Sequence, residues 1–314
     1  MGKHWTAEDI PFLRGRRFVI TGANTGIGYH AALKLARREA ELVLACRDQK
    51  KGEAARARIL DEAPGAKVEL AVLDLASLDS VRRFADKELA RQTPLHALIN
   101  NAGVMAVPQR TETADGFEMQ FGTNVLGHFA LTGLLLPALE RASSATESAR
   151  VVTIASIAHK RTNLRLDDLQ STQGYSPMRA YQQSKLGDLM FALELSRRSR
   201  AKGSTVMSIA AHPGVAATEL FRSEGRSATF RAVRSIVGHI ISIALNTDAE
   251  GALPTLYAAT STDVVDGGYY GPQGYQEMRG ETVGVAKVAP QACDTAAATR
   301  LWELCEQWTG VRFP

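Results

Sequence analysis

The 314-residue sequence contains few cysteines, little net charge and no long apolar run. Its three cysteines, Cys46, Cys293 and Cys305, are far apart and show no CxxC spacing. This argues against a disulfide framework or a zinc site, and it favours a reducing compartment. We therefore expect a cytoplasmic protein without a metal. The 37 basic and 33 acidic residues leave a net charge of +4, an excess too small and too dispersed to predict nucleic-acid binding.

A transmembrane segment is also not expected. No uninterrupted apolar run approaches the roughly 20 residues that span a bilayer. The nearest run, Ser235 to Leu245, is short and is interrupted by Gly238 and His239. The first 15 residues include no apolar stretch that resembles a signal peptide.

What the chain does contain is an alternation of strand-like and helical patterns. The strand-like runs cover residues 16–22, 41–46, 67–75, 95–103, 150–156, 204–214 and 266–272. They are continuously apolar, which is typical of parallel strands that helices cover on both faces. Repeated strand-helix units predict one α/β domain over residues 1–314, with a doubly wound sheet of about seven parallel strands and a core at about 15–270.

Two segments depart from this alternation. Residues of about 216–249 form an inserted helical excursion that carries both apolar side chains and arginines. This segment could cover a substrate pocket, pack on the core or a second subunit in a homo-oligomer, or face a membrane surface, and we favour the pocket. The C-terminal tail, about 291–313, has a helical pattern that predicts packing on the domain.

A glycine-rich turn follows the first strand directly, in the stretch TGANTGIG. Such a turn tolerates positive φ, lets the backbone approach a pyrophosphate, and leads into a helix whose N-terminus offers free N–H groups. Its position between the first strand and the first helix predicts a dinucleotide site and hence a Rossmann fold. The residues assigned to it are Gly22, Asn24, Thr25, Gly26, Ile27 and Gly28.

A tyrosine and a lysine lie four residues apart in YQQSK, on one face of a predicted helix. A tyrosine exchanges protons poorly at neutral pH unless its pKa is lowered, and an ammonium group one turn away lowers it. Of the seven tyrosines, only Tyr181 has a lysine, Lys185, at this spacing. An exposed surface pair is the alternative interpretation.

Other candidate residues stand at strand ends, where open parallel sheets bind ligands. Ser156 ends a strand and could hydrogen-bond a substrate carbonyl, although a capping serine is the alternative. Asn124 lies inside a helical pattern, where its side chain could hold a water. The remaining candidates at strand ends are Asn101, Ala102, Gly103, Pro213, Gly214 and Thr218.

The joint order of these motifs resembles the short-chain dehydrogenase/reductase family over residues of about 15–270. TGxxxGIG, Asp74–Leu75, NNAG, Asn124, Ser156, YxxxK and PG follow one another along the chain. Within the family, the stretches GANTGIG, ACRD, INNAGVM and DGFEMQFGTNVLGHFALT are most similar to the retinol-dehydrogenase-like and WW-domain-oxidoreductase-like branch. One departure is Ala155, where relatives often have a second serine.

The resemblance implies a mechanism. In the direction of reduction, hydride would pass from a nicotinamide to a substrate carbonyl while Tyr181 acts as general acid. Ser156 would polarise the carbonyl, Lys185 would lower the pKa of Tyr181 and hold the nicotinamide ribose, and Asn124 would position a water for proton supply. Asp74 and Leu75 would border the adenine, and Asn101 to Gly103 would line the cofactor cleft.

The end of the second strand, LVLACRDQK, bears on the choice of cofactor. In relatives that use NAD, an aspartate stands where this chain has Cys46. Arg47 follows, and its planar guanidinium suits the oxygens of a 2′-phosphate. We therefore predict NADP(H) over NAD(H), with the reservation that Asp48 could pair with Arg47.

The sequence thus predicts an NADP(H)-dependent oxidoreductase acting on a small lipophilic carbonyl or alcohol. Two alternatives stay open. The protein could reduce an activated C=C bond, or it could be a catalytically silent cofactor-binding sensor or scaffold. The sensor interpretation predicts that at least one catalytic residue has been replaced. The candidates Asn124, Ser156, Tyr181 and Lys185 are all present.

Overall fold

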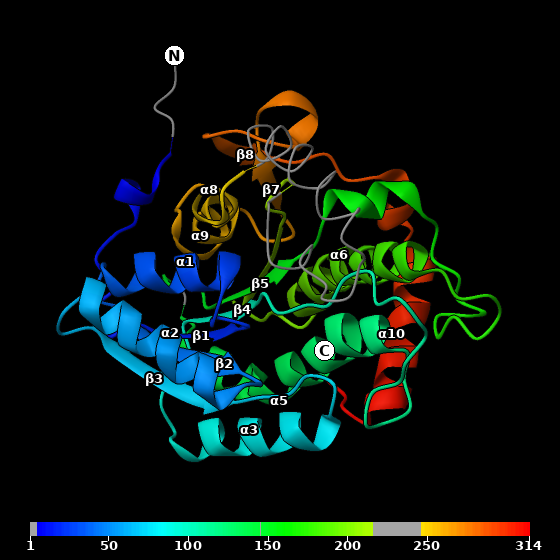
Figure 1. Ribbon diagram of the computed structural model, residues 1–314, viewed down its shortest axis with the longest axis horizontal. Helices are drawn as coiled ribbons and strands as arrows, with labels where there is room; N and C mark the ends of the chain where they lie inside the picture. Colours follow the sequence, from blue (N-terminus) through cyan, green and yellow to red (C-terminus); the bar gives the residue numbers. More distant parts are fainter. Residues whose placement is uncertain (1–4, 145, 216–245) are drawn as a thin grey trace, which may run out of the picture.

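The computed structural model describes residues 5–144, 146–215 and 246–314 as one α/β domain (Figure 1). Its sheet has eight strands in the order β3-β2-β1-β4-β5-β6-β7-β8. The strands are β1 (Arg17–Thr21), β2 (Glu41–Cys46), β3 (Lys67–Val72), β4 (Ala97–Asn100), β5 (Arg150–Ile154), β6 (Met207–Ala211), β7 (Tyr269–Pro272) and β8 (Val283–Val285). The predicted doubly wound sheet is confirmed.

The first seven strands are parallel, and β8 runs antiparallel to β7, with Gly271 opposite Gly284. The sequence pattern predicts about seven strands and gives no signal for β8. This strand has only three residues, one of them a glycine, and Val285 is 75% exposed. A short edge strand of this kind leaves no continuous apolar run in the sequence.

Helices lie on both faces of the sheet (Figure 1). The helices are α1 (Gly26–Ala36), α2 (Gln49–Glu62), α3 (Leu78–Ala90), α4 (Met119–Phe121), α5 (Gly127–Ala142), α6 (Pro177–Ala201), α8 (Asp248–Gly251), α9 (Leu253–Thr260) and α10 (Thr295–Thr309). A π-helical turn, Gly122–Leu126, joins α4 to α5, and short 3₁₀ turns include Ile157–Arg161 after β5. Helices α1, α2 and α9 lie on one face, and α3, α5, α6 and α10 on the other.

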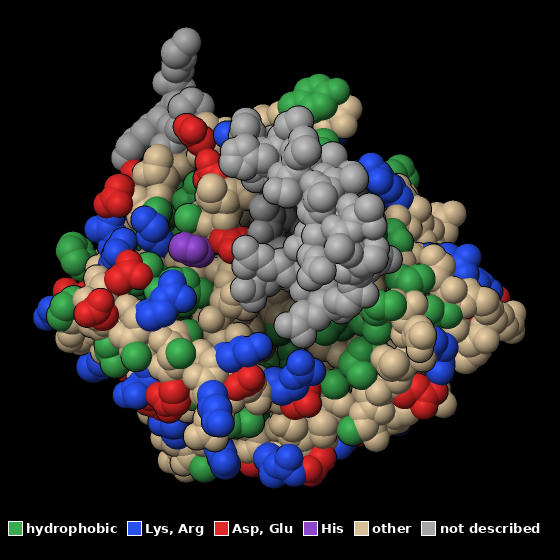
Figure 2. Space-filling view, viewed as in Figure 1, with side chains coloured by type: hydrophobic (Ala, Val, Ile, Leu, Met, Phe, Trp, Pro, Cys, Tyr) green, Lys and Arg blue, Asp and Glu red, His purple; other side chains and the backbone are tan. Residues whose placement is uncertain are grey.

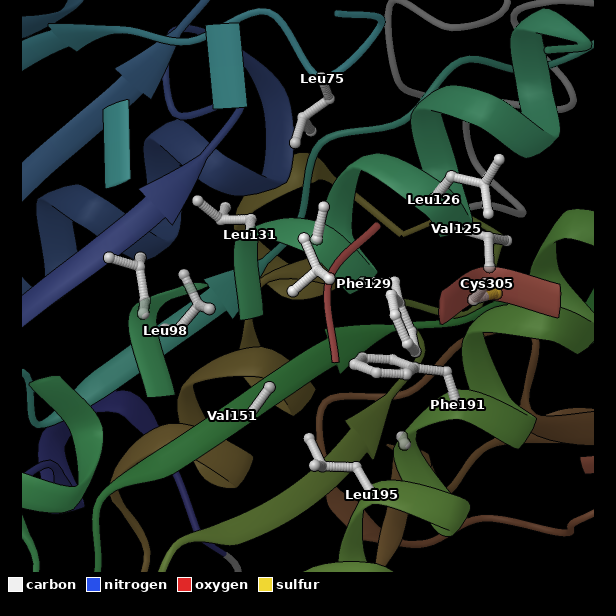
Figure 3. Close-up of a cluster of buried hydrophobic side chains, with 14 of the residues drawn as sticks. Leu75, Leu98, Val125, Leu126, Phe129, Leu131, Val151, Phe191, Leu195 and Cys305 are labelled. Atoms are coloured by element: carbon white, nitrogen blue, oxygen red, sulfur yellow. The ribbon is translucent and has the colours of Figure 1, made fainter. Parts of the chain in front are cut away.

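The strands between β2 and β7 in the sheet are mostly apolar because both of their faces are buried. In β1, Phe18 and Ile20 pack with α1 and α9, whereas Val19 between them packs with α3 and α5. Figure 3 shows part of the apolar cluster that contains Val19, on the face covered by α3, α5, α6 and α10. Phe129 of α5 and Phe191 of α6 meet there beside Cys305 of α10. Since successive side chains of a strand point to opposite faces, a strand between two helical layers needs apolar residues at every position.

The C-terminal tail packs on the domain as predicted. Trp302 of α10 is 2% exposed and packs with Phe129 of α5 and Phe191 of α6. The stretch Met119–Ala142, which includes α5, is long and apolar enough to cross a membrane, but 83% of its apolar window is buried inside this fold. The core helix of a soluble protein passes the same test, so this stretch is weak support for a membrane span.

The surface carries charges of both signs. On the face shown in Figure 2, Lys and Arg side chains are interspersed with Asp and Glu. The three cysteines form no disulfide; Cys46 and Cys305 are buried and Cys293 is exposed. Most of the predicted lid, residues 216–245, lies outside the described residues, and so does Thr218.

Candidate active site

A cavity of about 740 Å³ opens at the carboxyl ends of the parallel strands. It lies where the strand order reverses, since β1 pairs with both β2 and β4, and this is where doubly wound sheets bind their ligands. The predicted cofactor residues that line it are Gly22, Asn24, Thr25, Gly26, Ile27, Gly28, Arg47, Asp74, Leu75, Asn101, Ala102, Gly103, Tyr181, Lys185, Pro213 and Gly214.

The glycine turn leaves room beside its backbone. Gly22 and Gly26 have φ values of +66° and +58°, which L side chains rarely adopt. A Cβ on Gly22 would lie 2.9 Å from Ala102 Cα, and one on Gly28 would lie 2.5 Å from Asn101 Nδ2. Helix α1 begins at Gly26, and no side-chain hydrogen bond caps it at Thr25. Its first N–H groups are thus available to an anion, so the turn fits a pyrophosphate.

Thr21 ties the end of β1 to the end of β4, a role that the sequence analysis missed. Its Oγ1 accepts hydrogen bonds from the backbone N–H groups of Asn101 and Ala102, both at 2.9 Å. The Asn101 side chain reaches back and donates to Thr21 O at 2.8 Å. This clamp fixes the NNAG segment against the glycine turn. A fully buried threonine that ends a strand has no distinctive signal in the sequence.

His128 of α5 extends the same network toward Asn124. Burial lowers the pKa of His128 to about 3, so the ring is neutral near pH 7. Its Nδ1 lies 2.8 Å from Asn124 O, an acceptor only, so Nδ1 carries the hydrogen. Nε2 then accepts from the Thr21 hydroxyl at 2.9 Å. His128 therefore links the strand ends to the π-helical turn.

Asn124 sits within that π-helical turn, where its side chain is buried and fully held. Its Nδ2 donates to Val104 O at 3.0 Å and to Ser184 Oγ at 2.9 Å, and its Oδ1 accepts from Val104 N at 2.8 Å. Asparagine is a mediocre helix former, and here the helix is indeed irregular at Asn124. π-helical turns of this kind are often found at functional sites. Both amide hydrogens are used, so a water could approach only an oxygen lone pair.

Tyr181 and Lys185 both line the cavity from α6. The Tyr181 hydroxyl forms no hydrogen bond with any residue that the structure describes. Lys185 is 5% exposed, and its Nζ donates to Ile154 O and to Asp188 Oδ2, both at 2.8 Å. Burial opposes the charge on Lys185, but Asp188 and Tyr181 raise its pKa above the ordinary value, so it is an ammonium at neutral pH.

Ser156 stands at the end of β5 and lines the same cavity. Its Oγ accepts a hydrogen bond from Ala158 N at 3.2 Å, so it also caps the turn that follows. The capping and functional interpretations are therefore compatible, because accepting this bond leaves the hydroxyl hydrogen free to donate.

At the other end of the cavity, Arg47 is exposed and forms no ion pair among the residues described in the structure. Asp48 does not bind it; the Asp48 carboxylate instead caps α2 by accepting from Lys51 N at 3.0 Å. Cys46 is buried, which raises the pKa of its thiol to about 11, and the backbone N–H groups of Ala23 and Asn24 oppose this rise only in part.

The turn after β6 brings Pro213 and Gly214 to the cavity wall. Gly214 has a φ of +73°, and a Cβ there would lie 2.4 Å from Met278 O. Asn246, which the sequence analysis did not single out, donates to Pro213 O at 2.9 Å and fixes this turn. Ser156, Tyr181, Lys185 and both turns thus line one cavity. Asn124 is not among the lining residues, but it binds the backbone of Val104, which is.

The model of the short chain dehydrogenase family matches residues 16–229. The chain belongs to this family. Human retinol dehydrogenase 13 is 41% identical over 304 residues, covering 96% of this chain and 86% of that protein. Human polyprenol dehydrogenase is 42% identical over 253 residues, covering 80% and 75%. Family and relatives make this chain an oxidoreductase acting on alcohol or carbonyl groups, in the retinol-dehydrogenase-like branch that its motifs predict.

Solved structures agree with this fold. An uncharacterised protein from Mycobacterium paratuberculosis is 41% identical, with a TM-score of 0.78 over 99% of this chain and 100% of that one. The Pseudomonas aeruginosa RhlG/NADP complex has a TM-score of 0.62 at 23% identity, covering 82% and 95%.

Proposed function

We propose that the protein interconverts a carbonyl and an alcohol on a lipophilic substrate, with NADP(H) as cofactor and Tyr181 as general acid and base. The observation that carries this proposal is the convergence of Ser156, Tyr181 and Lys185 on the cavity that the glycine turn also lines. A bound nicotinamide would supply or accept the hydride. The protein's own residues would hold the substrate and move the proton.

In the direction of reduction, the carbonyl carbon gains the hydride and the carbonyl oxygen gains the Tyr181 proton, which yields the alcohol. Tyr181 is left as a phenolate, and the Lys185 ammonium one turn away stabilises it. Solvent then returns the proton, in our proposal through a water held at Asn124. Ser156 donates its free hydroxyl hydrogen to the substrate oxygen and so polarises the carbonyl. Oxidation of an alcohol reverses each step.

The NADP(H) preference rests on Arg47. Its guanidinium lines the cavity without an ion pair among the described residues, and Asp48 is engaged at the N-terminus of α2. A planar donor group of this kind binds phosphate oxygens in pairs. No aspartate takes the place of Cys46, so no carboxylate there would repel a 2′-phosphate. A solved structural neighbour of this fold binds NADP, which is compatible with this preference.

A lipophilic substrate suits the apolar side chains of the cavity. The apolar residues that line it include Met105, Ile157, Met178, Val215 and Met278. Pockets for small ligands typically combine such a lining with a few polar groups that fix orientation. Retinol and polyprenol, which name the two human relatives, are long apolar alcohols, and this supports a substrate of the same character.

A substrate panel tests this function. Aldehydes, ketones and enones of increasing chain length are offered with NADPH or NADH, and turnover is followed by the absorbance of the reduced cofactor. We expect turnover of apolar aldehydes or ketones, with a higher kcat/KM for NADPH. Turnover of enones alone would support the C=C reductase. Cofactor binding without turnover of any substrate would support the sensor or scaffold.

We also propose a cytoplasmic location, which a flotation assay with anionic liposomes tests. We expect the protein to stay in the soluble fraction. Co-flotation with the liposomes would contradict this and would favour the membrane-facing interpretation of residues 216–249.

A further inference from the structure

A second ionised group is buried beside the proposed catalytic pair. Asp188 lies on α6, three residues after Lys185, and is 2% exposed. Its Oδ2 accepts from Lys185 Nζ at 2.8 Å. A buried carboxylate is costly unless it is paired, so this contact is the reason that an aspartate is tolerated here. Nothing in the sequence pattern around Asp188 indicates this pairing.

Asp188 fixes the direction in which Lys185 points. An ammonium group has three hydrogens to donate. Asp188 and Ile154 O receive two of them, so a single hydrogen is left for a ligand. Lys185 lines the cavity, where a Cβ on Gly103 would lie 3.8 Å from its Nζ. The pair therefore holds the lysine in one orientation before any ligand binds.

Asp188 also offsets the charge of Lys185. The neighbouring titratable groups on other elements are His128 of α5 and Cys305 of α10, both buried. Burial lowers the pKa of His128 to about 3 and raises that of the Cys305 thiol above its ordinary value, so both are neutral near pH 7. Among the described residues, Asp188 is thus the only anion hydrogen-bonded to the Lys185 ammonium.

Two more titratable groups complete the cluster. Tyr181 lies one turn before Lys185 on α6 and raises its pKa, and Tyr181 and Glu277 act in the same direction on the pKa of Tyr269 of β7. Tyr269 is buried, which raises the pKa of its hydroxyl well above the ordinary value, so it adds no charge. Burial raises the pKa of Asp188 to about 6, which leaves it mostly ionised at pH 7. Near neutral pH the cluster therefore contains one buried cation and one buried anion.

We propose that Asp188 is a positioning residue that, through Lys185, sets the pH at which Tyr181 exchanges its proton. This inference rests on the proposed function. An unopposed ammonium would favour the Tyr181 phenolate strongly, and a phenolate cannot act as the acid in carbonyl reduction. The Asp188 carboxylate weakens that bias, so Tyr181 stays protonated to a higher pH. The pair thereby favours reduction at neutral pH.

The test compares pH profiles of kcat/KM for alcohol oxidation in the wild type and Asp188→Asn. Asparagine keeps the size and an oxygen for Lys185 but removes the charge. Without this negative charge, the Lys185 ammonium is less favoured and a phenolate beside it is no longer opposed by the carboxylate. We expect both limbs of the profile to move to lower pH, by about one unit. Oxidation below the wild-type limb would then rise several-fold, whereas reduction at alkaline pH would fall.

Two further variants separate charge from packing. Asp168→Asn removes another buried carboxylate, which binds Thr172 and Gln173 away from Lys185, and its profile should match the wild type. Asp188→Ser gives a second neutral site and should shift the profile in the same direction as Asp188→Asn. An Asp188→Asn profile that superimposes on the wild type, with only a lower Tm, would overturn the proposal. So would failure of both neutral variants to fold, because Asp188 would then be a folding requirement.

A direct titration keeps this inference separate from the proposed function. The phenolate absorbance of the wild type minus that of Tyr181→Phe reports Tyr181 alone. The same difference, measured in the Asp188→Asn background, should titrate at lower pH. If the wild type turns over no substrate, the proposed function fails, yet this titration still shows whether Asp188 controls Tyr181. Equal titration midpoints in both backgrounds would reject the inference.

Discussion

The two ends of the cavity are built in different ways. At the glycine turn and Arg47, the lining is mostly backbone, together with an exposed guanidinium that has no ion pair among the described residues. At the other end, Lys185 lines the cavity and Asn124 lies behind the lining residue Val104; both side chains are buried and hold two or three hydrogen bonds each. The first end therefore suits recognition of a ligand, whereas the second is organised before a ligand arrives.

This difference implies that substitutions at the two ends will have different kinetic signatures. Changes at the glycine turn or Arg47 should alter cofactor affinity and selectivity, and they should appear in KM. Changes at the buried end should alter kcat or stability, because the bonds there fix the groups that move the proton.

The largest effect is expected for Tyr181→Phe, which removes the proposed acid and leaves the ring. The variant should fold, still bind NADPH and lose kcat by roughly two to four orders of magnitude, the usual scale of general acid-base catalysis. Steady-state kinetics measure the loss, and thermal unfolding with and without NADPH checks that binding persists. Near-normal activity would remove Tyr181 from the mechanism.

The next substitution, Gly22→Ala, should weaken the binding of the cofactor at the glycine turn. Its φ of +66° is unfavourable for alanine, and the added Cβ would meet Ala102 Cα at 2.9 Å, so the turn and the NNAG segment must move apart. We expect NADPH affinity to fall at least about tenfold, measured by fluorescence titration, since displaced N–H groups bind phosphate poorly.

Gly65→Ala is the matched control for that experiment. Gly65 has a φ of +84° with no atom within 4 Å of the added Cβ, and it does not line the cavity. It carries a similar backbone strain and should leave NADPH affinity unchanged. Equal losses of NADPH affinity in the two variants would mean that backbone strain alone explains the effect, and not the close approach of the glycine turn to Ala102.

The sequence predicted the fold and part of the cavity lining because both leave local signals. Continuous apolar strands, the glycine turn and the Tyr181–Lys185 spacing are each visible within a few residues. The parallel sheet then forces the strand ends to one edge, which is why motifs scattered over most of the chain meet in one cavity.

What the sequence could not predict depends on contacts between distant residues. The Thr21 clamp joins β1 to β4, and His128 reaches Thr21 across 107 residues. The role of Asp188 follows from burial, which a helical sequence pattern alone does not reveal. Asp48 illustrates the same limit, because only the structure shows that it caps α2 instead of binding Arg47.

Arg47→Ala should have a more selective effect than the glycine variant. The cavity keeps its shape, but the guanidinium proposed to bind the 2′-phosphate is lost. We expect the KM for NADPH to rise about 10- to 100-fold, the scale of charge-assisted hydrogen bonds, with little change for NADH. Arg14→Ala, an exposed arginine outside the cavity, is the control. Equal effects on the two cofactors would show that Arg47 does not select between them.

The smallest catalytic effect is expected for Ser184→Ala, which removes one of the bonds at the buried end. Ser184 Oγ accepts from Asn124 Nδ2 at 2.9 Å and donates to Tyr181 O at 2.8 Å. An unpaired buried amide hydrogen costs about 1–3 kcal/mol, so the free energy of unfolding should fall by that amount. Asn124 keeps both of its bonds to Val104, so kcat should change by less than about threefold, a shift in barrier well below 1 kcal/mol. Denaturant unfolding and steady-state kinetics measure the two quantities. A loss of kcat beyond tenfold at preserved stability would mean that Ser184 itself takes part in proton supply. The two bonds to Val104 would then not be enough to keep Asn124 functional.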